Sequence, residues 1–130
     1  MEPTTPPAAA RLAVGARGEQ LAADHLRALG LEVVARNWRL STGPVRGELD
    51  LVALDHTRRL VVVCEVKTRT GDGFGGALLA VTPRKQAKIR RLTAAFLREA
   101  ALPYGQVRFD VAAVRLDRRS PTIDHVRAAF

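Results

Sequence analysis

The sequence of 130 residues predicts an α/β fold in which helices flank a mixed β-sheet, in the order α-β-β-β-α-β-β. Two segments, residues 11–29 and 82–101, repeat apolar residues every three or four positions, as one buried face of a helix requires. The segments between and after them carry apolar, strand-like runs that are separated by polar and glycine-containing turns. This succession of helical and extended segments is typical of a sheet packed between helices.

A single domain is expected to span residues 11–130, because a chain of this length can bury a sizeable core without dividing. Residues 1–10, MEPTTPPAAA, are rich in Pro, Thr and Ala and predict a disordered tail. The one cysteine, Cys64, excludes an internal disulfide and a cysteine-rich zinc site. Its strand-like neighbours indicate a small residue of the core.

The first predicted helix runs from Arg11 to Leu29, and Gly30 ends it. Its apolar stripe consists of six positions at helical spacing: Leu12, Ala16, Glu19, Ala22, Leu26 and Leu29. Glu19 is the exception in this stripe, because a buried carboxylate is costly unless it is paired or binds something. The alternative is that Glu19 lies at the edge of the stripe and reaches water.

Three strands are predicted next: LEVVARNW (31–38), GELDLVAL (47–54) and RLVVVCEVK (59–67). The polar turn DHTRR joins the second strand to the third, so we expect an antiparallel hairpin. The glycine-rich segment at 68–81 is expected to be a mobile loop. It does not match a P-loop, because no Gly-Lys-Ser/Thr follows its glycines.

Thr82 and Pro83 predict the N-cap and first residue of a second helix, which runs to about Ala101. Its inward residues are Ile89, Leu92 and Phe96, and its basic flank consists of Arg84, Lys85, Lys88 and Arg91. The segment QVRFDVAAVRL (106–116) predicts a fourth strand, and IDHVRAAF (123–130) predicts a short final strand or tail.

The charge balance favours an anionic partner. Lys and Arg number 21 against 13 Asp and Glu, which gives a net charge of +8, and a basic surface attracts the phosphates of nucleic acids. An arginine-rich genome would also produce this excess, so charge alone favours nucleic acid only modestly. No apolar run reaches the length of about 18–20 residues that crosses a membrane, and no signal peptide is recognisable, so we expect a soluble, cytoplasmic protein.

The predicted hairpin carries charges that a core element does not normally contain. Glu65 and Lys67 share one face of their strand, because strand side chains alternate. Folding the hairpin about its turn sets Asp50 nearly opposite Glu65, with Cβ atoms about 4.5–5.5 Å apart. Two carboxylates at that distance repel unless a divalent cation such as Mg²⁺ or Mn²⁺ lies between them. The alternative is a salt bridge to lysine on an exposed sheet face.

An acid on one strand followed by Glu-x-Lys on the next resembles the PD-(D/E)xK nuclease superfamily, which includes restriction enzymes and Holliday junction resolvases. Seven ordered blocks resemble the YraN family of uncharacterised bacterial proteins: GARGEQLAADHL, ARNWR, GELDLVA, VCEVKTR, FGGALLAVTPRKQAKI, VRFDVAAV and DHVRAAF. Together they cover essentially all of the chain from Ala13 to Phe130. The resemblance implies a restriction-endonuclease-like fold.

The same resemblance implies roles for individual residues. Asp50 and Glu65 match the metal-binding acids, with the backbone carbonyl of Val66 as a further ligand, and Lys67 matches the catalytic lysine. Glu19 matches an acidic residue that many resolvase-like members bring to the metal. Lys85 and Gln86 are looser matches to polar residues near the site, and Glu48, which shares a strand face with Asp50, is a further supporting residue. The proline of the motif name is absent, because Leu49 precedes Asp50.

The function implied is a Mg²⁺- or Mn²⁺-dependent endonuclease that hydrolyses phosphodiester bonds in DNA, with branched or repair intermediates as candidate substrates. The alternative is a nucleic-acid-binding module that keeps the fold but cleaves nothing. The expected phosphate contacts are Arg46, Arg69, Arg84, Lys85, Lys88 and Arg91. A homodimer is expected only by analogy with resolvases, which cut two symmetric strands.

Two more residues have a functional and a structural interpretation. Trp38 can stack on a base or anchor the core. Asp110 alternates away from the apolar face of its strand, so it either reaches the site or makes a structural hydrogen bond. A lone tryptophan is more often a core or interface anchor than a base-stacking residue, and for Asp110 a structural hydrogen bond is at least as well supported as a place in the site.

Overall fold

The computed structural model describes residues 7–40, 43, 46–70, 81–116 and 119–130. They form helices and strands in the predicted order α-β-β-β-α-β-β. The elements are α1 (Ala8–Ala28), β1 (Glu32–Arg39), β2 (Glu48–Asp55), β3 (Leu60–Arg69), α2 (Pro83–Glu99), β4 (Val107–Arg115) and β5 (Thr122–Val126). The predicted α/β class is therefore confirmed, and the arrangement is consistent with a restriction-endonuclease-like fold.

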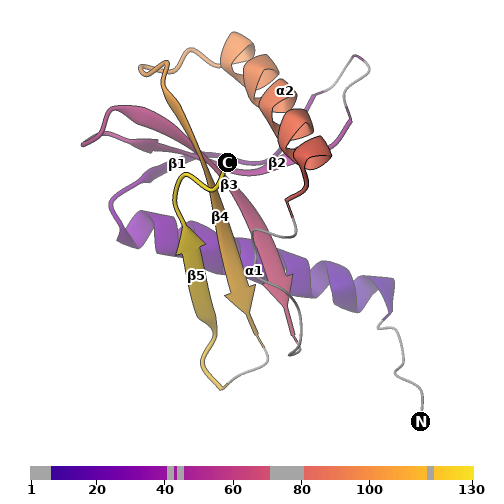
Figure 1. The fold of residues 1–130 in the computed structure, drawn as a ribbon. Coiled ribbons are helices and arrows are strands. Elements are labelled where there is room, and N and C mark those ends of the chain that lie inside the picture. The colour runs from indigo at the N-terminus through magenta and orange to yellow at the C-terminus, as the bar shows by residue number, and fades with distance from the viewer. Residues whose placement is uncertain (1–6, 41–42, 44–45, 71–80, 117–118) are drawn as a thin grey trace.

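The five strands form one sheet whose spatial order follows the sequence, β1-β2-β3-β4-β5 (Figure 1). Neighbouring strands are antiparallel except for β3 and β4, which are parallel. A parallel pair needs a long crossover connection, and α2 provides it. The sheet is therefore mixed, as the sequence predicts, and its parallel pair includes the central strand β3.

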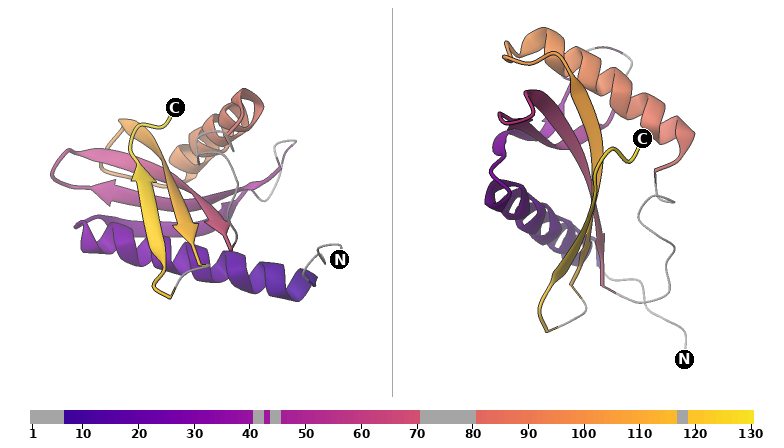
Figure 2. Two further views of the ribbon diagram at one scale, coloured as in Figure 1. Left: turned by 60° about the horizontal axis from the view of Figure 1, so that its bottom comes forward. Right: turned by 60° about the vertical axis from the view of Figure 1, so that its left-hand side comes forward.

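The two helices cover opposite faces of this sheet (Figure 2). The core on the α2 side consists of Leu49, Val52, Leu54, Val61, Val63, Val81, Ile89, Leu92, Phe96, Phe109 and Val111. The core on the α1 side consists of Ala22, Ala23, Leu26, Leu51, Ala53, Val62, Cys64, Ala112 and Val114. The inward residues predicted for the second helix and the buried cysteine are confirmed by these two cores.

Strand β3 is buried on both faces, which accounts for its unbroken apolar run. Side chains of a strand alternate between faces, and successive residues of β3 enter opposite cores: Val61, Val62, Val63 and Cys64. A central strand covered on both sides has no solvent face and needs no polar residues there. The charges of β3 follow this run directly, beginning with Glu65 and Lys67.

Some element boundaries differ from the prediction. Helix α1 begins at Ala8 rather than Arg11, so the last part of the expected tail is helical, while residues 1–6 lie outside the described residues. Strand β3 continues through Arg69 into the segment that was expected to be a loop. The rest of that glycine-rich segment, residues 71–80, lies outside the described residues.

The predicted apolar stripe of the first helix was wrong at both ends. Leu12 is 75% exposed and Leu29 is 44% exposed. A helix of 21 residues is about 32 Å long, whereas its buried residues extend only from Gly18 to Leu26. The N-terminal turns therefore project beyond the strands, as Figure 2 shows. Neither helix in the described part of the chain is long and apolar enough to span a membrane.

A glycine allows α1 to approach β3 closely. A Cβ atom added to Gly18 would overlap the side chain of Thr68, whose Cβ and Cγ2 would lie 2.9 Å away. By contrast, an added Cβ at Gly15, in the preceding turn, would meet nothing within 4 Å. This close approach brings the next residue, Glu19, toward the C-terminal end of β3.

Replacement of these two glycines is expected to have opposite effects. Gly18→Ala should lower the free energy of unfolding by about 1–3 kcal/mol, because the new methyl group forces α1 away from β3. Gly15→Ala should raise it by up to about 1 kcal/mol, because alanine is the better helix former and has free space there. Urea denaturation of both variants measures the difference, and similar effects at the two positions would refute the proposed packing constraint.

Candidate functional site

The hairpin of β2 and β3 carries its charged residues where the paired part of the two strands ends. The paired residues run from Asp55 with Leu60 to Leu51 with Cys64, and Asp50 and Glu65 come next on their strands, directly beyond the last pair. There the backbone N–H of Val66 donates to Oδ2 of Asp50 at 2.8 Å. A side-chain carboxylate thus satisfies a backbone donor beyond the paired residues, which fixes Asp50 against β3.

Strand β2 is irregular at the same point. Leu49 and Val52 both belong to the core on the α2 side, although strict alternation would set them on opposite faces. The adjacent strand β1 is irregular too, since Asn37 has a positive φ of 50° and its neighbour Trp38 packs on the α2 side. Local irregularities of this kind re-aim side chains. Asp50 lies within this irregularity, between residues that face the two helices.

Three carboxylates gather around this irregular point. Oxygen atoms of Glu19, Glu48 and Asp50 lie within 4.8 Å of one another. Burial raises the pKa of Glu19, and the negative charges of Asp50 and Glu48 raise it further, while the side chain of Asn37 opposes the shift. Burial also raises the pKa of Asp50, against the effect of the Val66 N–H. The cluster therefore concentrates negative charge that the surrounding protein compensates incompletely.

Glu65 is the fourth carboxylate, and it is only 3% exposed. Its Oε2 atom has no hydrogen-bond partner in the described part of the chain, and Nζ of Lys85 lies 3.9 Å from Oε1, beyond hydrogen-bond distance. Burial raises the pKa of Glu65 to about 7, and the negative charge of Asp50 adds to the shift. Glu65 is therefore a buried acid that lacks a tight partner within the described protein.

Lysine side chains lie beside these acids. Burial and, after it, the adjacent amine of Lys85 lower the pKa of Lys67 to about 8. These residues belong to a pocket of about 300 Å³ whose polar lining comprises Glu48, Asp50, Glu65, Lys67, Lys85 and Lys88. Carboxylates and amines thus share one small cavity between the hairpin and α2.

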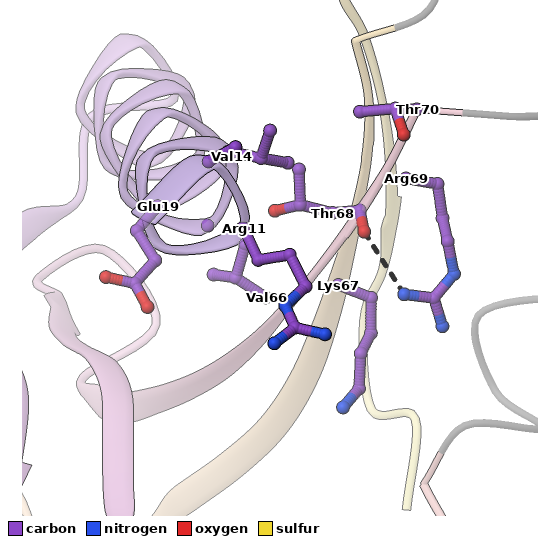
Figure 3. Close-up of a pocket in the computed structure, with 10 residues that line it drawn as sticks. Arg11, Val14, Glu19, Val66, Lys67, Thr68, Arg69 and Thr70 are labelled. Carbon is purple, nitrogen blue, oxygen red and sulfur yellow. Dashed lines mark hydrogen bonds between the residues drawn. The ribbon is translucent and has the colours of Figure 1, made fainter. Parts of the chain in front are cut away.

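A second hollow, of about 450 Å³, lies between α1 and the end of β3 (Figure 3). Val66 and Lys67 line both this hollow and the smaller pocket, so the two meet at β3. Arg11 and Glu19 of α1 line the larger hollow, and Figure 3 shows Arg11 and Lys67 extending toward the same region. Arg11 stands in the overhanging part of the helix, and no sequence pattern indicated that it would lie beside this hollow.

The predicted site residues do not all come together. Arg46, Arg84 and Arg91 are exposed and do not line these two hollows. Arg69 lines the larger hollow. The amide of Gln86 donates to the backbone carbonyl of Val81 at 3.0 Å, so it closes the start of α2 instead of facing the acids.

Glu48 and Lys88 contribute more than the sequence indicated. Glu48 was expected only to support the site, yet it joins the acidic cluster and accepts a hydrogen bond from Nε of Arg39 at 2.8 Å. Glu48 and Asp50 are two residues apart on one strand, and side chains at that spacing share a face, so the sequence did indicate that the two lie together. Lys88 was assigned to the basic flank of the helix, and its place in the pocket depends on how α2 packs, which the sequence does not reveal.

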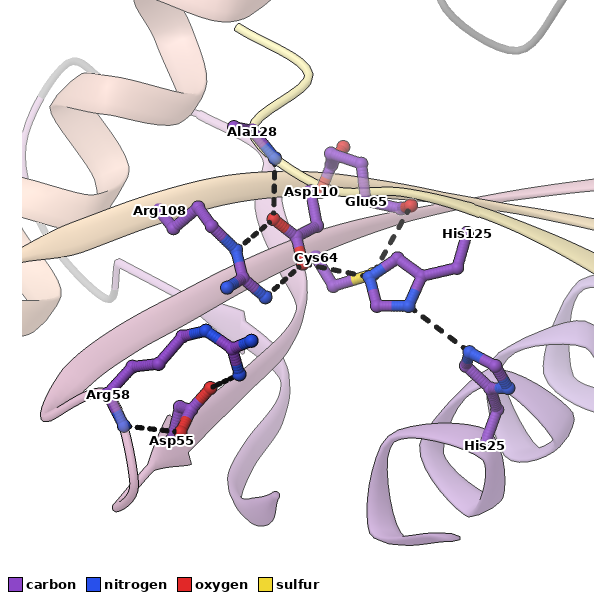
Figure 4. A network of polar contacts seen from close by, with 9 residues as sticks. All are labelled: His25, Asp55, Arg58, Cys64, Glu65, Arg108, Asp110, His125 and Ala128. Atoms are coloured by element: carbon purple, nitrogen blue, oxygen red, sulfur yellow. Dashed lines mark hydrogen bonds and ion pairs between the residues drawn. The ribbon is translucent and has the colours of Figure 1, made fainter. Parts of the chain in front are cut away.

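Asp110 has a structural role. It is fully buried and accepts hydrogen bonds from Arg108 at 2.8 and 2.9 Å and from the Ala128 N–H at 3.1 Å (Figure 4). His125 contacts it at 2.8 Å, and His25 of α1 contacts His125 at 3.1 Å. These bonds lower the pKa of Asp110 despite its burial. The network joins α1, β4 and the C-terminal segment.

Trp38 also has a structural role. Its ring packs edge to face against Phe96 of α2, with ring centroids 5.2 Å apart. Both rings contribute to the core on the α2 side. An aromatic pair of this geometry stabilises the contact between sheet and helix, which supports the core-anchor interpretation of Trp38.

The comparisons with known proteins identify a family. A family model described as "Uncharacterised protein family UPF0102" matches residues 18–114. A UPF0102 protein of Acidothermus cellulolyticus is 50% identical over 135 aligned positions, which cover 95% of this chain and 97% of the relative. A UPF0102 protein of Mycobacterium avium is 46% identical, over 95% of this chain and 94% of the relative. The YraN family is UPF0102, so the resemblance seen in the sequence is confirmed. The chain belongs to the uncharacterised protein family UPF0102.

Proposed function

We propose that this protein is a Mg²⁺- or Mn²⁺-dependent endonuclease that hydrolyses phosphodiester bonds in DNA, with branched or recombination intermediates as candidate substrates. The observation that carries the proposal is the environment of Glu65. Its carboxylate is buried in the pocket that Asp50 and Lys67 also line, and within the described residues its Oε2 atom has no hydrogen-bond partner. Acids and a lysine in this arrangement suit phosphoryl chemistry better than they suit a structural role.

The donor atoms fit a hard divalent cation. Asp50 and Glu65 offer carboxylate oxygens and Val66 offers its backbone carbonyl, while Glu19 and Glu48 lie close enough to Asp50 to contribute. Oxygen donors of this type are those that Mg²⁺ and Mn²⁺ prefer. When bound there, such a cation would polarise a phosphate and lower the pKa of a water molecule. The repulsion among the carboxylates would also be relieved.

Lys67 is the proposed catalytic amine. It shares the pocket with Asp50 and Glu65, so a phosphate entering the pocket meets its Nζ atom. In its charged form the amine donates hydrogen bonds to phosphate oxygens that gain negative charge as water attacks. In its neutral form it accepts a proton from that water, and a pKa near 8 makes both forms accessible close to neutral pH.

The basic surface supports a polyanionic substrate. Three arginines predicted to contact phosphates, Arg46, Arg84 and Arg91, have exposed side chains, and the whole chain carries a net charge of +8. Contacts of this kind position a nucleic-acid backbone without reading its sequence. They supply affinity that weakens steeply as salt rises.

Cleavage assays test the proposed reaction. Wild-type protein with Mn²⁺ or Mg²⁺ should cut at least one of a labelled four-way junction, flap, single strand or duplex of DNA, and EDTA should abolish cutting. Lys67→Ala and Glu65→Gln should each lower the rate by about 100-fold or more, because the first removes the amine that acts on the reacting phosphate and the second removes a ligand of the cation. Arg98→Gln, which changes an exposed residue of α2, is the matched control.

Two outcomes would contradict this proposal. Stable binding of these DNAs with no cleavage in either cation would indicate a non-catalytic nucleic-acid-binding module. Equal cleavage by wild type and by both site variants would show that a different centre, or a contaminant, hydrolyses the substrate. RNA of matched sequence is assayed in parallel, so that cleavage of DNA and cleavage of RNA can be compared.

The pH dependence of stability provides an independent test of the buried acid. The pKa of Glu65 is raised from 4.5 to about 7 in the folded protein, so the folded state holds the proton more tightly than the unfolded state. Stability from this group is therefore lost as pH rises across that interval. Without divalent cations, Glu65→Gln should be more stable than wild type at about pH 8, and this advantage should shrink toward about pH 5.

Urea denaturation in EDTA at the two pH values measures this difference. Addition of Mn²⁺ at the higher pH should stabilise wild type more than the variant, because ligands that bind the native state favour it. A stability difference that does not change with pH would show that Glu65 has an ordinary pKa.

A further inference from the structure

The sequence uses lysine at three positions only, Lys67, Lys85 and Lys88, and its other 18 basic residues are arginines. All three lysines line the pocket of about 300 Å³ that also contains Asp50 and Glu65. They come from different elements, one from β3 and two from α2. In a chain this rich in arginine, all three lysines therefore lie at the candidate site.

Lysine and arginine differ in a way that bears on this location. The lysine ammonium is a compact point charge on a flexible stem, whereas the arginine guanidinium is a wide planar fork that favours fixed, bidentate pairs. A compact ammonium can occupy the space beside a carboxylate that a small cation would occupy, and it can leave without rearranging the backbone. Amines therefore suit a site whose counter-ion must be exchanged.

The contact between Lys85 and Glu65 has the properties of an exchangeable pair. Nζ of Lys85 lies 3.9 Å from Oε1 of Glu65, while Oε2 of Glu65 has no hydrogen-bond partner among the residues that the structure describes. The Glu65 side chain is almost fully buried, whereas that of Lys85 is 37% exposed. Lys85 stands in the first turn of α2 and can turn toward solvent without opening the core.

Lys88 reaches the pocket through a glycine. An added Cβ at Gly47 would lie 2.7 Å from Cε and 3.1 Å from Nζ of Lys88, and Gly47 has a φ of +117°. Other residues rarely adopt this backbone conformation. The absence of a side chain directly before Glu48 therefore leaves room for a second amine from α2.

We propose that Lys85 is the counter-ion of Glu65 while no divalent cation is bound, and that it transfers to a substrate phosphate when the cation takes its place. This inference rests on the proposed function of the pocket as a cation-dependent phosphate site. Cation and nucleic acid then bind with positive coupling. Binding of the cation displaces the Lys85 ammonium from Glu65, and the displaced ammonium then binds the phosphate. A bound phosphate in turn keeps this ammonium away from Glu65, so that Glu65 can bind the cation.

Thermodynamic linkage makes this coupling measurable in either direction, because each ligand changes the affinity of the other by the same factor. Couplings of this kind typically correspond to about 5- to 150-fold in affinity. Removal of the Lys85 charge should therefore have two consequences. The free protein should bind the cation more tightly, and the presence of nucleic acid should strengthen cation binding less than it does in wild type.

The experiment compares Mn²⁺ affinity of wild type, Lys85→Gln and Lys85→Met by calorimetric titration. Each protein is titrated alone and with a short phosphorothioate-substituted DNA duplex, which resists hydrolysis. Without DNA, both Lys85 variants should bind Mn²⁺ about 10-fold more tightly than wild type, and with DNA the gap should close. Arg98→Gln removes the same charge from the far end of α2 and should bind Mn²⁺ as wild type does.

The outcomes separate this inference from the proposed function. If wild type binds no Mn²⁺, the proposed cation site itself is wrong. If wild type binds Mn²⁺ but the Lys85 variants bind it equally or more weakly, the cation site stands and the counter-ion role of Lys85 is overturned. An increase in affinity that Arg98→Gln reproduces would reflect net charge alone and would overturn it as well.

Discussion

Burial of β3 on both faces is the constraint on which the rest of the structure depends. A strand with apolar residues on both sides requires a covering layer on each face, and α1 and α2 provide these layers. It also requires a strand on each side, supplied by the hairpin with β2 and by the parallel pairing with β4. The crossover that creates the parallel pair is the same helix that brings amines to the pocket.

The charged centre lies where this constraint ends. The buried run of β3 ends at Glu65. On β2 the last residue paired with β3 is Leu51, which is the neighbour of Asp50. Backbone groups beyond the paired residues need other partners, and Asp50 satisfies the N–H of Val66. The protein thus holds carboxylates at the margin of its core, where burial strengthens every electrostatic interaction. Elements from both faces reach this margin, α1 through Glu19 and α2 through Lys85.

The sequence predicts those parts of the structure that follow from local rules. The alternation of side chains and the length of one turn were sufficient to predict that Asp50, Glu65 and Lys67 lie close together, and all three line one pocket. Helical periodicity located α1 but overestimated its buried face, because the width of the sheet decides where burial stops. Lys88 was unpredictable as a pocket residue for the same reason, since its position depends on the packing of α2 over Gly47.

The Asp110 network ties the C-terminal segment to the sheet by several specific contacts. The Ala128 N–H donates to the buried Asp110 carboxylate at 3.1 Å, and the Ala129 N–H donates to the Phe109 carbonyl at 2.7 Å. Phe130 stacks on Phe109, with ring centroids 5.1 Å apart. Terminal residues usually fray, and their amide hydrogens exchange rapidly with solvent. Here those of Ala128 and Ala129 open only when the interior of β4 loses its polar contacts, so their hydrogen-exchange rates report on the central sheet.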